Sequence, residues 1–177
     1  MDQEEKTLKE NLIYDGKILQ LYNDEILTPG GKIAHREYIN HHGGASVLPI
    51  DEDGNIYLVE QYRYAYRQLL LEIPAGKLEN GEDAKKCAIR ELKEEIGAEC
   101  KEIKDMGIVY PTPGYTNEPL HIYVATGLTF GDTNWDEDEY INIKKIPFKN
   151  ALEMVKSGEI KDGKSVVAIL RYALFKG

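Results

Sequence analysis

The sequence has few cysteines and no long apolar run. Cys87 and Cys100 are the only cysteines among the 177 residues, and their positions suggest neither a zinc site nor a disulfide framework, so we expect a reducing, cytoplasmic setting. The polar, charged start MDQEEKTLKE does not read as a signal peptide. Since no apolar stretch approaches the roughly 20 residues that cross a bilayer, we expect no membrane partner.

A basic charge balance is also lacking. The formal net charge is −9, which argues against nucleic acid as a partner, because phosphate backbones reward basic patches. A small anionic substrate is still compatible with this charge if a metal ion and a few local arginines meet its phosphates.

The length and pattern favour one main domain with a small N-terminal addition. We expect a division into residues 1–42, which hold short strands turning at Pro29-Gly30-Gly31, and residues 43–177. The main domain should contain a helix over 148–157 closed by Gly158, and a last helix capped within 162–165. Its strands are expected near 45–50, 55–62, 69–73, 101–110, 119–126 and 139–146.

The segment from Gly76 to Ala98, GKLENGEDAKKCAIRELKEEIGA, is the most informative in the chain. Asn80 reads as an N-cap with Asp83 as a capping-box-like partner, and Gly97 reads as the C-cap. These signals predict a helix over roughly 81–96.

Acidic residues gather on one side of this predicted helix. At about 100° per residue, Glu91, Glu94 and Glu95 share a side, and Arg90 lies close enough to hydrogen-bond and orient Glu94. Like charges at this spacing cost a few tenths of a kcal/mol per pair, a penalty that a bound divalent cation would reverse. A solvated, Glu-rich helix is the alternative, with Ile89, Leu92 and Ile96 entering the core in either case.

The full spacing, G-x5-E-x7-R-E-U-x-E-E-x-G-U with U apolar, resembles the Nudix box at every defined position. The resemblance implies an α/β (α+β) fold, an α/β/α sandwich with a mixed sheet, joined here to a small N-terminal antiparallel sheet. It implies hydrolysis of a nucleoside diphosphate linked to another moiety, with Mg²⁺ as cofactor and Mn²⁺ as a possible substitute. Glu91 and Glu95 would be the principal ligands, Glu94 would assist, and the Ala75 carbonyl would complete the shell.

A second motif indicates the branch of the family. Pro113 follows Gly97 by about sixteen residues, and Gly114-x-x-x-Glu118 follows at once, which resembles ADP-ribose pyrophosphatases. That branch cleaves ADP-ribose to AMP and ribose 5-phosphate as a homodimer, and it carries arginines near the substrate at positions matching Arg36 and Arg63. The resemblance therefore implies a nucleotide-sugar substrate bound by Arg36, Arg63, Pro113 and Glu118. Another nucleotide sugar, or a non-catalytic ADP-ribose sensor, is the alternative.

Hydrolysis also needs a group that activates water. The acidic run Asp136-Glu137-Asp138-Glu139 precedes an expected strand, and in ADP-ribose pyrophosphatases a glutamate on the corresponding loop is thought to take this role. Alignment to the following strand favours Glu137, with Glu139 second or as a further metal ligand. The expected catalytic set is thus Glu137, Glu139, Glu94 and Arg90.

Overall fold

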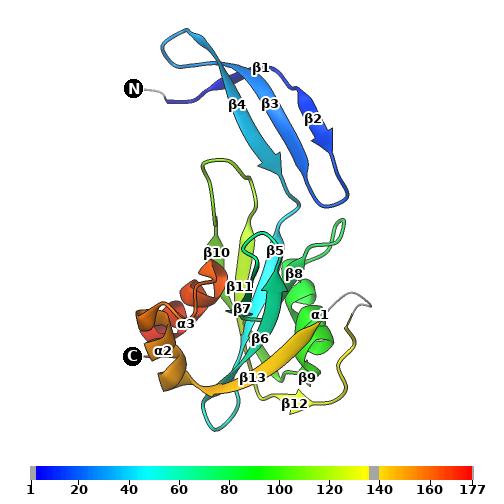
Figure 1. Cartoon of the computed structure of the whole chain (residues 1–177), viewed down its shortest axis with the longest axis vertical. Helices are drawn as coiled ribbons and strands as arrows, with labels where there is room; N and C mark the ends of the chain where they lie inside the picture. Colours follow the sequence, from blue (N-terminus) through cyan, green and yellow to red (C-terminus); the bar gives the residue numbers. More distant parts are fainter. Residues whose placement is uncertain (1–2, 136–139, 177) are drawn as a thin grey trace. The chain divides into compact units, whose positions relative to one another are not determined.

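The computed structural model describes residues 3–135 and 140–176 (Figure 1). The described residues divide into two compact units, one within Met1–Gly43 and Thr112–Glu118, the other within Gly44–Pro111 and Pro119–Gly177. No helix in these described ranges is long and apolar enough to cross a membrane.

The first unit is an antiparallel sheet centred on β3 (Gln20–Leu27). β4 (Ile33–Asn40) pairs with β3 along its whole length, whereas β1 (Lys6–Lys9) and β2 (Leu12–Asp15) pair with its two halves. The predicted hairpin turn lies between β3 and β4, where Gly31 adopts a left-handed φ of 76°.

The loop 112–118 belongs to this first unit. The Ile39 amide donates to the Tyr115 carbonyl at 2.8 Å, and the His41 amide donates to Asn117 Oδ1 at 2.8 Å. Residues 113–115 form a turn, and these bonds, with the bridge between Ile39 and Thr116, hold the loop against the end of β4.

The described residues of the second unit form two larger sheets and three helices. One sheet has the order β10-β11-β5-β8 and the other has the order β13-β6-β7. β11 pairs with β5 in parallel and the other pairs of these sheets are antiparallel, so the first sheet is mixed, as predicted, and the second is antiparallel. The strands of this unit are β5 (Gly44–Pro49), β6 (Asn55–Arg63), β7 (Gln68–Glu72), β8 (Ala75–Lys77), β9 (Ala98–Glu99), β10 (Glu102–Val109), β11 (Leu120–Thr126), β12 (Thr129–Phe130) and β13 (Ile141–Pro147).

Helices cover both faces of these sheets (Figure 1). Neighbouring residues of β5 point to opposite faces, as a pleated strand requires. Val47 joins a buried cluster with Cys87 and Leu92 of α1 (Ala84–Ile96), whereas Leu48 joins a second cluster with Ala151 of α2 (Phe148–Ser157) and with residues of α3 (Gly163–Lys176). The predicted α/β/α sandwich is therefore confirmed.

The start of α1 differs from the prediction. Asp83 is the N-cap and its carboxylate accepts the Lys86 amide at 3.1 Å, so the expected cap at Asn80 and the start at 81 are wrong. Gly81 has a left-handed φ of 76°, and the Glu82 amide donates to the Glu79 carbonyl, so a tight turn precedes the helix.

The other end of α1 follows the sequence. Gly97 is the C-cap at a φ of 65°, as predicted, and Gly158 closes α2 in the same way. Leu92 and Ile96 are buried, but Ile89 is 40% exposed, so the prediction that it enters the core is wrong. The helix buries Cys87 and Ala88 instead, because small side chains allow it to approach β5 closely.

Asp51 links the β5–β6 turn to β13 and gives a prediction about acid stability. Its carboxylate accepts the Asn55 amide at 2.8 Å and the Tyr57 hydroxyl at 3.2 Å, and it pairs with Lys145 Nζ at 2.8 Å. Burial acts to raise the pKa of Asp51, but the bonds from Lys145, Asn55 and Tyr57 outweigh it and hold that pKa well below its ordinary value.

A carboxyl group with a lowered pKa stabilises the fold above its ordinary pKa, and this contribution is lost as the pH falls through the lowered value. We expect Asp51→Asn to lower Tm at pH 7 by about 2–4 °C, the change that a loss of about 1 kcal/mol produces in a domain of this size. The difference from the unsubstituted protein should shrink below about pH 4. Thermal melts from pH 7 to pH 2 measure it, and a constant difference would contradict the assignment.

Candidate active site

The acidic face of α1 is built at the join between the helix and β8. Cys87 and Leu92 anchor the helix in the core beneath it. Glu91 and Glu95 lie one turn apart on the helix and are nearly buried, with 9% and 5% of their surface exposed. Burying a carboxylate costs free energy unless hydrogen-bond donors or cations contact it, so donors or cations are expected beside these two side chains.

Arg90 joins three of the acidic side chains. Its guanidinium donates to Glu91 Oε1 at 2.6 Å, to Glu94 Oε2 at 2.9 Å and to Glu82 Oε1 at 3.1 Å. The hydrogen bond to Glu82, then the charge of Glu91, raises the pKa of Arg90. The structure thus confirms the predicted Arg90–Glu94 bond and adds two more.

Glu82 also holds the turn that precedes the helix. Its Oε2 accepts the Glu79 amide at 3.0 Å, and the hydrogen bond from Arg90 lowers its pKa. Glu82 therefore stays ionised and ties the loop 78–83 to the acidic face.

Strand β8 lies directly against the two buried carboxylates. The Ala75 amide donates to Glu95 Oε2 at 3.3 Å. A Cβ added to Gly76 would lie only 1.7 Å from Glu91 Oε1, so glycine is the residue that leaves room for this carboxylate. The structure brings Ala75, Glu91 and Glu95 together, as expected of a common ligand set.

The donor set suits a hard divalent cation. Carboxylate and backbone oxygens are the ligands that Mg²⁺ prefers, and Mn²⁺ accepts the same type. No cluster of three or more His, Cys, Asp or Glu side chains within residues 3–135 and 140–176 is already arranged around a metal position. Arg90 accounts for this, because it draws Glu91 and Glu94 toward its own guanidinium. The residues fit a metal ion if Glu91 and Glu94 direct some of their oxygen lone pairs toward the metal instead of toward Arg90.

Arg63 supplies positive charge near this face. Its guanidinium holds Glu72 through two bonds, Nε to Oε1 at 2.6 Å and Nη2 to Oε2 at 2.7 Å. These bonds raise the pKa of Arg63, and the charge of Glu95 contributes to the same effect, so Glu95 lies within electrostatic range. The Arg63 side chain remains 41% exposed. The predicted substrate residue Arg63 thus shares this unit with the predicted metal ligands.

The segment 131–135 caps the C-terminal end of α1. The amides of Gly131 and Asn134 donate to the carbonyls of Gly97 and Glu94 at 2.7 and 3.0 Å, and Trp135 Nε1 donates to the Glu95 carbonyl at 2.9 Å. Carbonyls at a helix end otherwise lack partners. Sequence reasoning missed this role of Trp135, although the chain has a single tryptophan.

The predicted base candidates follow this segment. Glu137 and Glu139 lie outside the described residues, so their roles stay predictions. Trp135, the last described residue before them, is hydrogen-bonded to the Glu95 carbonyl.

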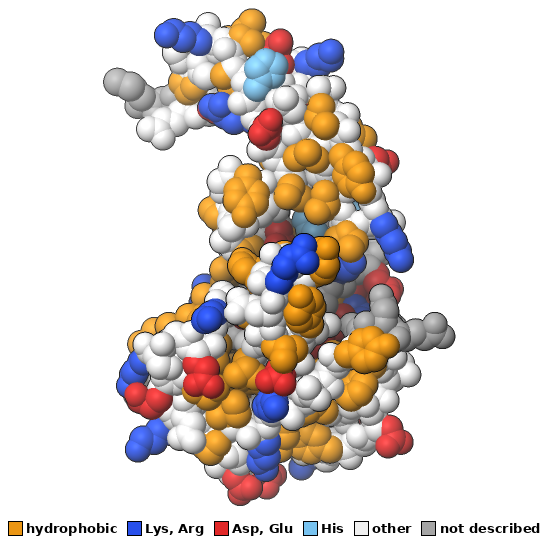
Figure 2. Space-filling model, in the orientation of Figure 1, with side chains coloured by type: hydrophobic (Ala, Val, Ile, Leu, Met, Phe, Trp, Pro, Cys, Tyr) orange, Lys and Arg blue, Asp and Glu red, His pale blue; other side chains and the backbone are white. Residues whose placement is uncertain are grey.

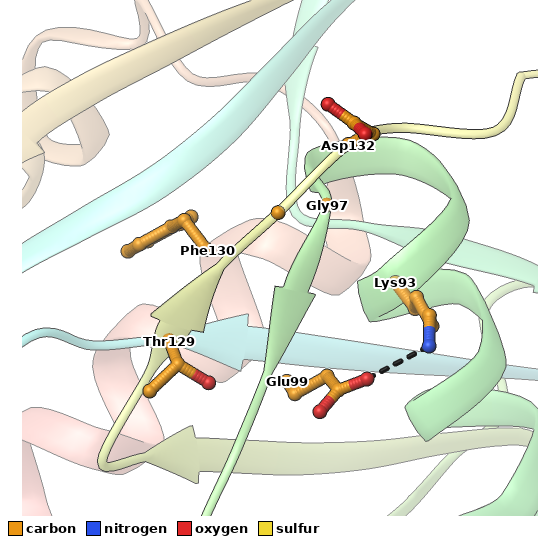
Figure 3. Close-up of a pocket in the computed structure, with 7 residues that line it drawn as sticks. Lys93, Gly97, Glu99, Thr129, Phe130 and Asp132 are labelled. Carbon is orange, nitrogen blue, oxygen red and sulfur yellow. Dashed lines mark hydrogen bonds and ion pairs between the residues drawn. The ribbon is translucent and has the colours of Figure 1, made fainter.

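A cavity of about 440 Å³ opens beside the same end of α1 (Figure 3). Lys93 and Glu99 form an ion pair at 2.7 Å on its wall, and the rest of the lining comes from Gly97 and residues 129–132. Neither the acidic residues of α1 nor Arg63 line it. We therefore do not assign this cavity to the substrate.

The remaining predicted substrate residues lie in the first unit. Arg36 is half exposed and forms a two-point ion pair with Glu5, with Nε at 2.9 Å from Oε2. Glu118 lies 3.6 Å from His41 Nδ1, and Pro113 lies in the same loop. Arg36, Pro113 and Glu118 therefore belong to the first unit, whereas Arg63 and the acidic helix belong to the second.

Comparison with known proteins identifies the family. Residues 40–168 match the model of the NUDIX domain, which covers most of the chain and includes the whole acidic helix. The chain belongs to the Nudix family. Its predicted family membership is confirmed.

Two named relatives align with nearly the full chain. It is 38% identical over 168 residues to the methanol dehydrogenase activator of Bacillus methanolicus, and 36% identical over 168 residues to the ADP-ribose pyrophosphatase of Bacillus subtilis (strain 168). Each match covers 94% of this chain and 91% of the relative. A crystal structure of an ADP compounds hydrolase superposes with a TM-score of 0.86 at 18% identity, covering 98% of this chain and 94% of that one, which supports the fold.

Proposed function

We propose that this Nudix protein is a hydrolase that cleaves the pyrophosphate bond of ADP-ribose or related ADP-sugars with Mg²⁺, giving AMP and a sugar phosphate. The observation that carries the proposal is the pair of buried carboxylates, Glu91 and Glu95, held against Ala75 and Gly76 within electrostatic range of Arg63. Carboxylates that can hold a metal ion, close to a guanidinium, suit a substrate whose anionic diphosphate binds both a metal ion and a positively charged side chain.

The roles of the residues follow from their places. Glu91, Glu95 and the backbone at Ala75 would hold the cation, with Glu94 assisting. When bound, a divalent cation neutralises the diphosphate oxygens and lowers the pKa of water that it binds. Arg90 orients Glu91 and Glu94, and its high pKa keeps it charged throughout the working pH range. Arg63 would bind a phosphate through the exposed side of its guanidinium.

Water supplies the atom that completes the reaction. Its oxygen forms the new P–O bond as the bridging P–O bond breaks, and its proton passes to a base, for which we propose Glu137, with Glu139 as the second candidate. Arg36, Pro113 and Glu118 remain proposed substrate contacts.

We also propose a homodimer. Among the described residues of the first unit, Ile26 is the one hydrophobic side chain that is fully buried, whereas Ile13, Ile18 and Ile33 are more than half exposed. Hydrophobic side chains are visible across the face of this unit that Figure 2 shows. An exposed apolar sheet of this kind is a typical association surface. The free thiols of Cys87 and Cys100 fit the cytoplasm as the setting.

A substrate panel with Mg²⁺ and with Mn²⁺ tests the function. We expect the highest kcat/KM for ADP-ribose, with AMP and ribose 5-phosphate as products, and lower values for other ADP-sugars, GDP-mannose and nucleoside triphosphates. Reaction in ¹⁸O-labelled water assigns the attacked phosphorus, because one product alone gains the label. A higher kcat/KM for GDP-mannose would favour another nucleotide sugar, and tight ADP-ribose binding without products would favour a sensor.

A further inference from the structure

A charged residue lies buried at the end of strand β7 in the second unit. Glu72 ends the run Leu69–Leu71, and only 3% of its side chain is exposed. Two cations hold it: Arg63 binds both of its oxygens, and Lys164 of α3 pairs with Oε2. Burial acts to raise the pKa of Glu72, but Arg63 and Lys164 outweigh it and lower that pKa, so the carboxylate is ionised.

The contacts continue into the start of α3. Lys164 Nζ also lies 3.1 Å from Asp162 Oδ1. Asp162 Oδ2 accepts the Ser165 amide at 3.0 Å and the Ser165 hydroxyl at 2.6 Å, which makes it the cap of α3. The Ile73 amide in turn donates to Ser165 Oγ at 2.7 Å. The first turn of α3 is therefore fastened to Glu72 and to the next residue, Ile73.

Stability alone gives no reason for this arrangement. Taking ions out of water costs several kcal/mol each, and an apolar replacement for a buried ion pair is often neutral or stabilising. The three side chains differ in exposure: 3% of the Glu72 side chain and 11% of the Lys164 side chain are exposed, whereas 41% of the Arg63 side chain is exposed. The buried members thus support one accessible guanidinium.

Lys164 also changes the charge that Arg63 presents. Arg63, Glu72, Lys164 and Asp162 are connected by ion pairs, and their four charges sum to zero. Without Lys164 the two carboxylates would leave one net negative charge beside Arg63, which would weaken its attraction for an anion. The planar guanidinium, held at two points, keeps its outer edge in a fixed direction.

We propose that Glu72 and Lys164 are positioning residues that fix the Arg63 guanidinium for the substrate diphosphate, with Asp162 and Ser165 holding Lys164 in place. The inference rests on the proposed function, since it requires Arg63 to bind a substrate phosphate. It adds residues of α3, outside the acidic helix, to the substrate-binding arrangement.

The first test uses steady-state kinetics with ADP-ribose and Mg²⁺. We expect Lys164→Met to raise KM about tenfold, equivalent to about 1.4 kcal/mol, with kcat changed less than about threefold, because binding is weakened while the acidic helix is untouched. Lys164→Arg should restore much of the loss, since it keeps the charge. Lys156→Met, which removes an exposed lysine of α2, is the matched control and should leave both constants unchanged.

A double-mutant cycle separates positioning from general support of the fold. If Lys164 acts through Arg63, Lys164→Met should add no further rise in KM in an Arg63→Ala background. Equal effects in both backgrounds would overturn the proposal, as would a fall in kcat with KM unchanged. Lys164→Gln gives the same comparison if thermal melts show that Lys164→Met is unfolded.

The failure of the proposed function has a different outcome. If the unsubstituted protein does not turn over ADP-ribose, the function proposal fails before any variant is compared. If it does so and Arg63→Ala leaves KM unchanged, the function stands and the positioning proposal is overturned.

Discussion

Glu95→Gln should lower kcat for ADP-ribose by roughly 10²–10³-fold, the loss typical of removing one preorganised electrostatic group. Glutamine has nearly the same shape and keeps a carbonyl oxygen to accept the Ala75 amide, which Glu95 Oε2 now accepts at 3.3 Å. The substitution therefore removes the charge and spares the packing. Because a neutral amide is a much poorer ligand for a hard cation, we expect metal binding to weaken along with turnover.

Two measurements accompany the kinetics. Thermal melts should show a Tm equal to or above that of the unsubstituted protein, since a buried charge has been removed. Titration with Mn²⁺, followed by electron paramagnetic resonance, should show weaker binding. Glu153→Gln, at an exposed site of α2, is the control and should change neither quantity. Near-normal turnover by Glu95→Gln would remove Glu95 from the ligand set.

Much of the main domain could be predicted because its elements end at strong local signals. Gly97 and Gly158 ended their helices where expected, since a glycine readily adopts the left-handed φ that closes a helix. The start of α1 could not be placed in this way. Asn80 and Asp83 are both good caps, and the choice between them depended on Gly81, whose left-handed φ ends a turn before the helix begins.

The composition of the acidic site could be predicted better than its contacts. The spacing identified which carboxylates share a side, but the threefold bonding of Arg90 depends on where the loop carrying Glu82 returns. Contacts between distant segments have no local signal at all. Lys164 meets Glu72 across 92 residues, and Trp135 meets Glu95 across 40. A lone glutamate after three leucines was the one visible sign of the first of these contacts.

Gly76→Ala should abolish most activity while leaving the fold intact. The added Cβ would lie 1.7 Å from Glu91 Oε1 and 2.1 Å from its Cδ, so the carboxylate must move away from its present place. The φ of Gly76 is not in the left-handed region, so alanine adds no backbone strain there. The whole effect comes from the clash between the added Cβ and the Glu91 side chain. Since the end of a glutamate side chain can rotate, the cost falls on the position of a metal ligand and not on the core.

We therefore expect kcat to fall by about 10²-fold or more and Mn²⁺ affinity to drop, as when a metal ligand is misplaced. Tm should change by only a few degrees. Gly30→Ala is the control, because a Cβ there meets no atom within 4 Å and its φ is not left-handed. A second comparison tests the cause: in a Glu91→Ala background the clash is gone, so Gly76→Ala should cause no further loss of Tm or of metal binding. An additional loss there would mean that β8 itself, and not the Glu91 carboxylate, requires glycine at this position.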